Sequence, residues 1–241
     1  MFLQHSLEHR TKNGWRYYIV DEENEISYPS VTSILGKTTD KSGIKRWEER
    51  IGIEEAAKIS KFSANRGSFM HSLLEHMLNA KFVFDTEFQI KDIYKSAVED
   101  NKELSVEEYK CGSKLFNQFS FTPFYDLIGS VVYQETPVWC ERFKYAGRLD
   151  LVIRDKAGHL VLIDFKTSKK PKKEIYIINY FLQVAAYSNA LYVRYGEFPQ
   201  RAEIWISCET GEVQTFVVNR EDLKKRFSEF SKLANQFHRD I

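Results

Sequence analysis

Cysteine is scarce in this sequence and is not arranged to bind metal or to form disulfides. The 241 residues include three cysteines, and these lie far apart, without a C-x-x-C motif, at Cys111, Cys140 and Cys208. An odd number of isolated cysteines argues against a disulfide framework, a zinc ribbon and a four-cysteine iron–sulfur cluster. A chain without disulfides is typical of a reducing compartment, and we therefore expect an intracellular protein.

Long apolar runs are missing as well. Residues 1–20 contain no convincing signal or transit pattern, and no later window approaches the length of a membrane span. The sequence thus predicts a cytoplasmic location and no membrane partner.

Neither sign of charge is in excess. The chain has 35 Lys and Arg residues against 34 Asp and Glu residues, a net charge of +1, so nucleic acid could be bound only through a local basic patch. Its 43% hydrophobic and 29% charged residues are typical of a folded globular chain and argue against disorder. Because repeats and low-complexity linkers are absent, we expect a single domain over residues 1–241.

Two apolar segments around a turn carry the strongest candidates for a functional site. Residues 147–154 and 159–166 are rich in β-branched and large apolar side chains, and Asp-Lys-Ala-Gly at 155–158 supplies turn chemistry. The segments are therefore predicted to pair as an antiparallel hairpin. A three-residue loop with a left-handed glycine would place Asp150 opposite Asp164.

The same register gathers two carboxylates and a lysine on one face. Lys166 shares the face of Asp164 because strand side chains alternate, whereas a slip of one residue would send the two acids to opposite faces. Two close carboxylates raise each other's pKa unless a cation neutralises them. Magnesium or manganese would do so, since both prefer oxygen ligands, and the Phe165 carbonyl could supply another oxygen.

Such a cluster would suit phosphoryl chemistry. Lys166 could hold or help deprotonate a water that attacks phosphorus, or it could offset charge in the transition state. The alternative is an ordinary hairpin with an ion pair on an exposed face, which is the commoner meaning of an isolated D-x-K tripeptide.

Periodicity and turn residues predict further elements on both sides of this hairpin. Before it we expect a β-hairpin over 15–28, a helix with an apolar stripe from residue 65, a helix from Ser105 to about Phe121, and a strand over 128–139. After it we expect a helix over 177–195, a β-hairpin of strands 202–207 and 213–218, and a helix over 220–238. The strand over 128–139 should enter a central sheet beside the two strands of the hairpin.

Several polar residues on these elements have two interpretations. His71 flanks the apolar stripe of its helix and is either a packing residue, which is the commoner case, or a metal ligand. Glu135 could reach the metal site from a neighbouring strand or lie at the edge of the sheet. Gln183 and Tyr187 lie four residues apart on one side of a helix and could bond a nucleotide or the backbone, or be ordinary helix-edge residues.

Two further segments could contact phosphate. Residues 169–173 read Lys-Lys-Pro-Lys-Lys, and beside clustered carboxylates their charge would offset the repulsion of DNA or RNA, although a solvated loop is the alternative. Ser30 and Thr32 could donate to phosphate, but the capping of a short helix is favoured.

The order of these motifs resembles that of the PD-(D/E)xK nuclease superfamily, and it looks most like the RecB-type branch. The motifs follow one another over roughly half of the chain as G-S-x-x-H at 67–71, G-R-L-D ending at Asp150, D-F-K at 164–166 and Q-x-x-x-Y at 183–187. P-S-V-T-S-I-L at 29–35 and the helix with R-W-E-E-R at 46–50 are similar to segments of mitochondrial genome maintenance exonucleases and related phage exonucleases.

This resemblance implies an α/β fold with a restriction-endonuclease-like αβββαβ core, in which helices flank a central mixed sheet. An N-terminal helical elaboration would precede the core. We expect the N-terminal hairpin and helices over 1–64, the catalytic core over 65–219 and a C-terminal helix over 220–241.

The resemblance also implies roles for the candidate residues. His71, Asp150, Asp164 and the Phe165 carbonyl would hold Mg²⁺, for which Mn²⁺ would substitute; Lys166 would assist the water, and Gln183 with Tyr187 would orient the site or the substrate. Two departures from the family pattern matter. The second acid is aspartate where many members have glutamate, which shortens its reach to the metal. The cysteines that hold an iron–sulfur cluster in some RecB-type relatives are missing, so no cluster is expected.

The function expected from these motifs is that of a metal-dependent DNA exonuclease that prefers single-stranded DNA with a free end. A structure-selective or restriction-like endonuclease and a catalytically silent DNA-binding subunit are the alternatives. The resemblance places the protein in the cytoplasm of a bacterium or phage-infected cell, with the mitochondrial matrix as the alternative.

Overall fold

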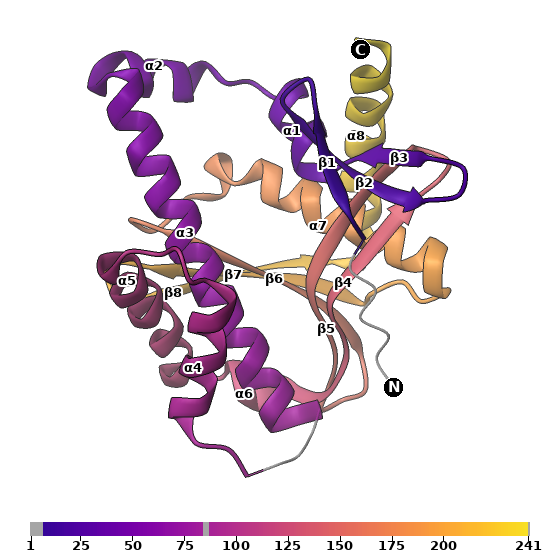
Figure 1. Cartoon of the computed structure of the whole chain (residues 1–241). Coiled ribbons are helices and arrows are strands. Elements are labelled where there is room, and N and C mark those ends of the chain that lie inside the picture. Colours follow the sequence, from indigo (N-terminus) through magenta and orange to yellow (C-terminus); the bar gives the residue numbers. More distant parts are fainter. Residues whose placement is uncertain (1–6, 84–86, 241) are drawn as a thin grey trace.

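A five-stranded mixed sheet forms the centre of the fold in this computed structural model, which describes residues 7–83 and 87–240. The strands lie in the order β4-β5-β6-β7-β8, with helices on both faces (Figure 1). Only β6 and β7 pair in parallel, and the other neighbours in this sheet are antiparallel. The bounds are β4 Ile128–Cys140, β5 Tyr145–Asp155, β6 Leu160–Ser168, β7 Arg201–Cys208 and β8 Val213–Asn219. The expected α/β fold with a central mixed sheet is confirmed.

One long helix makes the parallel connection between β6 and β7. Parallel neighbours need such a crossover because a tight turn can join only antiparallel strands. This helix is α7 (Ile178–Tyr195), which follows the 3₁₀ turn Glu174–Tyr176. It ends at Gly196, whose φ of 77° is left-handed and whose N–H bonds to the Tyr192 carbonyl at 2.8 Å. The expected αβββαβ core is formed by α3 (Ile53–Leu78), β4, β5, β6, α7 and β7, and β8 adds an antiparallel edge strand. Three helices are inserted after α3, namely α4 (Ile90–Asp100), α5 (Val106–Asn117) and α6 (Phe124–Leu127).

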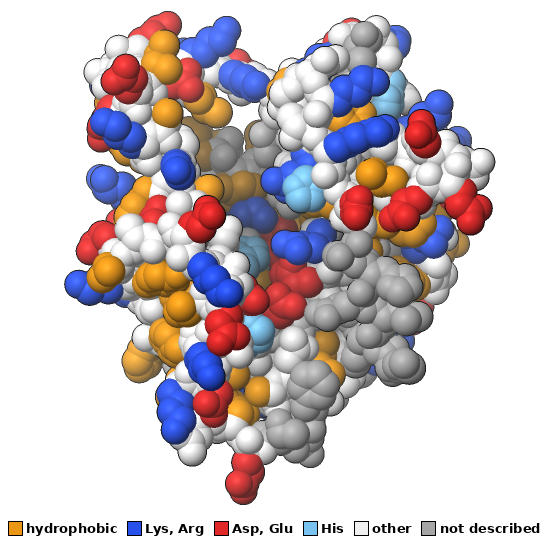
Figure 2. Space-filling view, in the orientation of Figure 1, with side chains coloured by type: hydrophobic (Ala, Val, Ile, Leu, Met, Phe, Trp, Pro, Cys, Tyr) orange, Lys and Arg blue, Asp and Glu red, His pale blue; other side chains and the backbone are white. Residues whose placement is uncertain are grey.

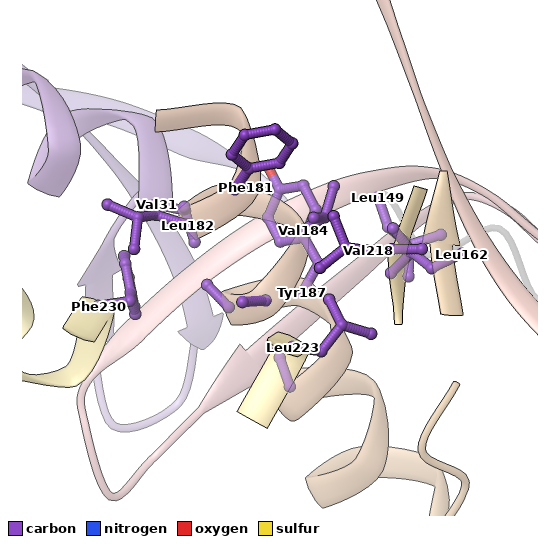
Figure 3. Packing of buried hydrophobic residues seen from close by; sticks show 14 of the residues in the cluster. Val31, Leu149, Leu162, Phe181, Leu182, Val184, Tyr187, Val218, Leu223 and Phe230 are labelled. Atoms are coloured by element: carbon purple, nitrogen blue, oxygen red, sulfur yellow. The ribbon is translucent and has the colours of Figure 1, made fainter. Parts of the chain in front are cut away.

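Helices cover both faces of the sheet and enclose two hydrophobic clusters. On one face α3, α4, α5 and α6 pack over residues such as Leu151 and Ile163. On the other face α1, α7 and α8 pack over residues such as Leu149 and Leu162 (Figure 3). The helix bounds are α1 Val31–Thr38, α2 Ser42–Ile51, α3 Ile53–Leu78, α4 Ile90–Asp100, α5 Val106–Asn117, α6 Phe124–Leu127 and α8 Arg220–Arg239, with a π-helical turn at Asn79–Val83 and a 3₁₀ turn at Gln118–Phe121. Within the described part of the chain, none of the helices has the combined length and apolar character of a membrane span.

Local capping explains where two of the helices begin. Ser105 forms a capping box at the start of α5. Ser30 caps α1, because its hydroxyl accepts a hydrogen bond from the Ser33 N–H at 2.9 Å, and the favoured interpretation of Ser30 is thereby confirmed. α3 already begins at Ile53, so this helix runs through residue 65, where we expected the catalytic core to start.

The N-terminal region forms a second sheet beside the start of β5. Its three strands lie in the order β1-β2-β3, with bounds β1 His9–Lys12, β2 Trp15–Asp21 and β3 Ile26–Pro29. The hairpin predicted over 15–28 is present as β2 and β3, and β1 extends it. Ser30 forms a parallel bridge with Ala146, which ties this N-terminal sheet to β5 (Figure 1).

The central sheet divides where β5 and β6 separate, and we call this place the fork. The ladder between the two strands ends at the pair Leu151 and Ile163, whereas β5 stays paired with β4 back to Tyr145 and β6 stays paired with β7 up to Ser168. The residues just beyond the last shared pair therefore face a gap between β5 and β6. Across this gap their backbone groups form no hydrogen bonds of the sheet ladder.

Candidate active site

The hairpin of β5 and β6 has the register expected from its turn. Gly158 has a left-handed φ of 84°, and the pairs run up to Leu151 with Ile163. Asp150 and Asp164 are the next residues on the two strands, so both stand at the fork. The expected register is confirmed, but the two acids follow the end of the ladder instead of lying within it.

The backbone N–H and carbonyl of Phe165 lie at the fork, where side chains are their hydrogen-bond partners. Its N–H donates to Asp150 Oδ2 at 2.7 Å. Its carbonyl accepts from His71 Nε2 at 3.1 Å and from Lys166 Nζ at 3.4 Å. The carbonyl oxygen predicted as a ligand thus lies among the predicted site residues.

Three side chains at the fork are close enough to hold one cation. His71 of α3, Glu135 of β4 and Asp150 of β5 each offer a ligand atom, and these atoms lie within 4.8 Å of one another. His71 Nδ1 is 3.8 Å from Asp150 Oδ2. Burial lowers the pKa of His71, which favours the neutral ring that metal ions bind. The structure therefore brings His71 and Glu135 together with Asp150.

Glu135 has an unusual backbone conformation. Its φ is 46°, a left-handed value that is uncommon for a residue with a side chain and that costs conformational energy. The adjoining residues of β4 pair with β5 on both sides of it, which places Glu135 across from Asp150. Arg148 Nε contacts the Glu135 carboxylate at 2.8 Å. Burial and the charge of Asp150 raise the pKa of Glu135 to about 8.

Asp164 and Lys166 form a buried ion pair beside this group. Asp164 is 1% exposed, and its Oδ1 has no hydrogen-bond partner among the described residues. Burial raises the pKa of Asp164 to about 7, although Lys166 opposes the shift. Burial would lower the pKa of Lys166, but Asp164 and Asp150 raise it above its ordinary value, so the ammonium stays charged. The alternative of an ion pair on an exposed face is therefore wrong.

Gln183 and Tyr187 lie on α7, and Tyr187 is close enough to the carboxylates of the fork to feel their charge. Both side chains are buried, and Gln183 Nε2 donates to Tyr187 Oη at 3.2 Å. The ring covers Gly147, where an added Cβ atom would lie 2.4 Å from Tyr187 Cε1. This contact explains the glycine of G-R-L-D. Burial and the nearby Asp164 raise the pKa of Tyr187. The role of both residues in orienting the site or the substrate stays a prediction.

The fork lies on the floor of a cavity of about 730 Å³, which we call the cleft. α3 lines one wall, and the N-terminal sheet with the start of α1 lines the other. Figure 2 shows acidic side chains at the bottom of a hollow between two lobes. Sequence reasoning missed Arg16 and Tyr18 of β2 in the cleft, for which the basic and aromatic segment W-R-Y-Y was the available signal, and it missed Arg148 of β5 as well. Ser30 and Thr32, considered as phosphate donors, also line it.

Comparison with known protein families shows the family to which this chain belongs. Residues 46–240 match the family described as the PD-(D/E)XK nuclease superfamily, and this match includes α3, the fork and α7. The chain belongs to that superfamily. The resemblance inferred from the order of the motifs is thereby confirmed.

Two individual proteins are also similar to this PD-(D/E)XK nuclease. "Mitochondrial genome maintenance exonuclease 1" of Mus musculus is 31% identical over 175 residues, which are 68% of this chain and 44% of the relative. The chain therefore spans less than half the length of that relative. Among solved structures, a protein of Eubacterium rectale described as a candidate exonuclease is 13% identical, with a TM-score of 0.41 and a match that covers 69% of this chain and 68% of that one.

Nucleases of this superfamily use divalent metal ions, and the side chains at the fork fit such an ion. Carboxylate and carbonyl oxygens suit hard divalent ions, and a neutral imidazole nitrogen is a common additional ligand. Asp164 Oδ1 is buried without a hydrogen-bond partner in the described ranges, which costs free energy unless a cation compensates it. His71 of α3, Glu135 of β4 and Asp150 of β5 bring ligand atoms within 4.8 Å of one another beside it.

Proposed function

We propose that this nuclease is a metal-dependent deoxyribonuclease that degrades single-stranded DNA from a free end. One arrangement carries the proposal, namely that three ligand side chains converge at the fork beside the charged Lys166, on the floor of a cleft that Arg16 and Arg148 also line. The name of the mouse relative supports the exonuclease mode. Basic and aromatic side chains in the cleft wall support a preference for single strands, because they can pair with phosphates and stack on unpaired bases.

The proposed ion is Mg²⁺, with Mn²⁺ as a substitute. His71, Glu135, Asp150 and the Phe165 carbonyl would hold it together with Asp164. When bound, such an ion polarises a phosphoryl oxygen and lowers the pKa of a coordinated water. Glu135 is added here to the ligands that the sequence motifs imply, because its ligand atom lies within 4.8 Å of those of His71 and Asp150.

The residues of the chain would position the reactants. The carboxylates of Asp164 and Asp150 favour the charged form of Lys166, and an ammonium there can donate hydrogen bonds to the attacking water or to a phosphate oxygen. The Phe165 N–H fixes the carboxylate of Asp150. Arg148 can pair with a phosphate, since its side chain is 58% exposed toward solvent.

Two substitutions test the site directly. Asp164→Asn and Lys166→Ala should each abolish the release of nucleotides from linear single-stranded DNA in Mg²⁺, while circular dichroism shows that the fold survives. Lys156→Ala is the matched control, because this lysine lies in the exposed turn at the far end of the same hairpin, and it should cleave at the rate of the unaltered protein. Activity retained in both purified site variants would refute the proposal.

A panel of end-labelled substrates separates the alternatives. An exonuclease should digest linear single strands with Mg²⁺ or Mn²⁺ and leave circular single strands intact, because a circle has no end. Cleavage of the circle would instead identify a structure-selective or restriction-like endonuclease. A catalytically silent DNA-binding subunit would cleave no substrate and would bind neither metal in calorimetry.

A further inference from the structure

A second groove lies next to the cleft. It has a volume of about 580 Å³ and shares two lining residues with the cleft, Ser63 of α3 and Thr167 of β6. Gly67 of α3 lies beside Thr167 at this boundary, since an added Cβ atom would lie 3.4 Å from Thr167 Oγ1. Small side chains therefore form the boundary that the two cavities have in common.

Each acidic side chain of this groove has a cationic neighbour. Glu209 pairs with Arg66, which is buried, and Glu55 contacts Lys58 at 4.0 Å. A carboxylate with a cationic partner repels an approaching anion less than a free carboxylate does. The acids in the groove are thus no obstacle to an anionic ligand.

Two lysines give the groove its free positive charge. Lys169 and Lys172 line it, and neither has an ion-pair partner among the residues that the structure describes. Both follow β6, the strand that carries Lys166, and Lys169 lies three residues beyond Lys166, a path of about 10 Å at the rise of a strand. The positive charge of Lys169 therefore lies only a few residues along the chain from the fork.

Aromatic rings complete the lining of the groove. Tyr180 and Phe62 both border it, and the Tyr180 ring also lies 5.4 Å from Lys166 Nζ. Rings beside free ammonium groups are the combination that binds single strands without regard to sequence, because bases stack on the rings while phosphates pair with the charges.

We propose that this groove binds the part of the single strand that continues from the segment in the cleft, with the backbone crossing at Ser63 and Thr167. Lys169 and Lys172 contact its phosphates, and Tyr180 stacks on a base. This inference rests on the proposed function, because it assigns the neighbouring part of the same substrate. The lysine-rich run after β6 then has a defined partner instead of being a solvated loop.

The dependence of binding on oligonucleotide length tests the groove. Fluorescein-labelled oligothymidines of about 4 and 16 nucleotides are titrated, at several salt concentrations, into the full chain with Asp164→Asn, which prevents cleavage. Adding Lys169→Glu and Lys172→Glu should weaken binding of the longer strand about tenfold or more, with a smaller loss for the shorter one. The slope of log affinity against log salt should fall by about 1.4 in magnitude, since each phosphate contact on a single strand contributes about 0.7.

A charge-matched control and a neutral variant complete the design. Lys156→Glu with Lys225→Glu reverses two exposed lysines outside the groove and should keep the salt slope. Ser63→Trp should remove the advantage of the longer strand without changing the charge, because the indole fills the shared boundary.

Each result has a definite meaning. If the affinity depends on strand length in both groove variants as it does in the unaltered protein, the proposal that the groove binds DNA is overturned. An equal loss of affinity for both strand lengths also overturns it, because that result indicates only a long-range charge effect. If the unaltered protein cleaves DNA but gains no affinity with length, the groove is overturned and the proposed function stands. If it neither cleaves nor binds any strand, both are overturned.

Discussion

Gly147 and Tyr187 are in direct contact, and a Cβ atom on residue 147 would lie 2.4 Å from Cε1 of the Tyr187 ring. Real atoms do not approach so closely, so a larger residue at 147 must displace the ring. Because the ring is buried between α7 and the fork, a displacement there reaches the carboxylates directly.

Gly147→Ala should therefore destabilise the fold by about 1–3 kcal/mol, as overpacking of a filled core does. Urea denaturation measures the loss, and Tyr187→Leu in the same chain should recover part of it by vacating the space. Gly43→Ala is the control, since an added Cβ meets no atom within 4 Å there and alanine is the better helix former. A Gly147→Ala protein as stable as the unaltered one would contradict this packing.

The two raised carboxyl pKa values predict how the stability of the metal-free protein depends on pH. Burial raises the pKa of Asp164 from 3.8 to about 7 and that of Glu135 from 4.5 to about 8. In the unfolded chain these groups lose their protons first, so their contribution to stability is complete at low pH and is lost as the pH rises toward 7 and 8.

Denaturation midpoints at several pH values, in the presence of a chelator, measure this loss. Glu135→Gln should make the stability fall less steeply with rising pH, since the amide has no proton to lose. Glu23→Gln, in an exposed turn, should leave the pH dependence of stability unchanged. The same decline in Glu135→Gln as in the unaltered chain would show that Glu135 is not buried as described.

Binding of Mg²⁺ should release protons in the neutral range. Metal ligands must be deprotonated, and the pKa of Glu135 is about 8. Calorimetry in two buffers with different ionisation enthalpies measures the number released. Affinity should rise with pH, and Glu135→Gln should reduce both the affinity and the proton release. Binding that is independent of pH and of Glu135 would exclude this residue as a ligand.

Lys166→Met should destabilise the protein more at pH 8 than at pH 5.5. The substitution leaves Asp164 buried without its counter-ion, which raises its pKa further, and an uncompensated buried charge is costly. At the lower pH the carboxyl is protonated and the cost disappears. Thermal unfolding measures the difference, and adding Asp164→Asn to the same chain should recover the stability lost at pH 8. Additive effects of the two substitutions would contradict the pairing.

The geometry of the hairpin could be predicted because it is fixed locally. The turn residues at 155–158 lie next to the strands that they join, and a left-handed Gly158 sets the register in which Asp150 and Asp164 follow the last pair. Lys166 then falls on the face of Asp164 by strand alternation alone. No distant contact is needed for this part of the site.

The placement of Glu135 could not be predicted in the same way. β4 contains two shifts of register against β5, and Glu135 itself has a φ of 46°, so simple alternation does not give the direction of its side chain. Arg16 and Tyr18 entered the cleft only through the packing of the N-terminal sheet, which local patterns do not encode. The structure pairs Asp164 with Lys166 beside the other ligand atoms, and the part of Asp164 in holding an ion stays a prediction.

The contact between His71 and the carbonyl of Phe165 joins residues 94 positions apart in the chain. Closing so large a loop costs chain entropy before the contact repays it, and we therefore expect this contact to form after the local hairpin. A partly folded chain in which α3 has not yet docked on β6 would have the hairpin but lack the ligand that α3 carries. Cutting activity should therefore develop only with the last steps of folding, so that its recovery after dilution from denaturant lags behind the formation of secondary structure.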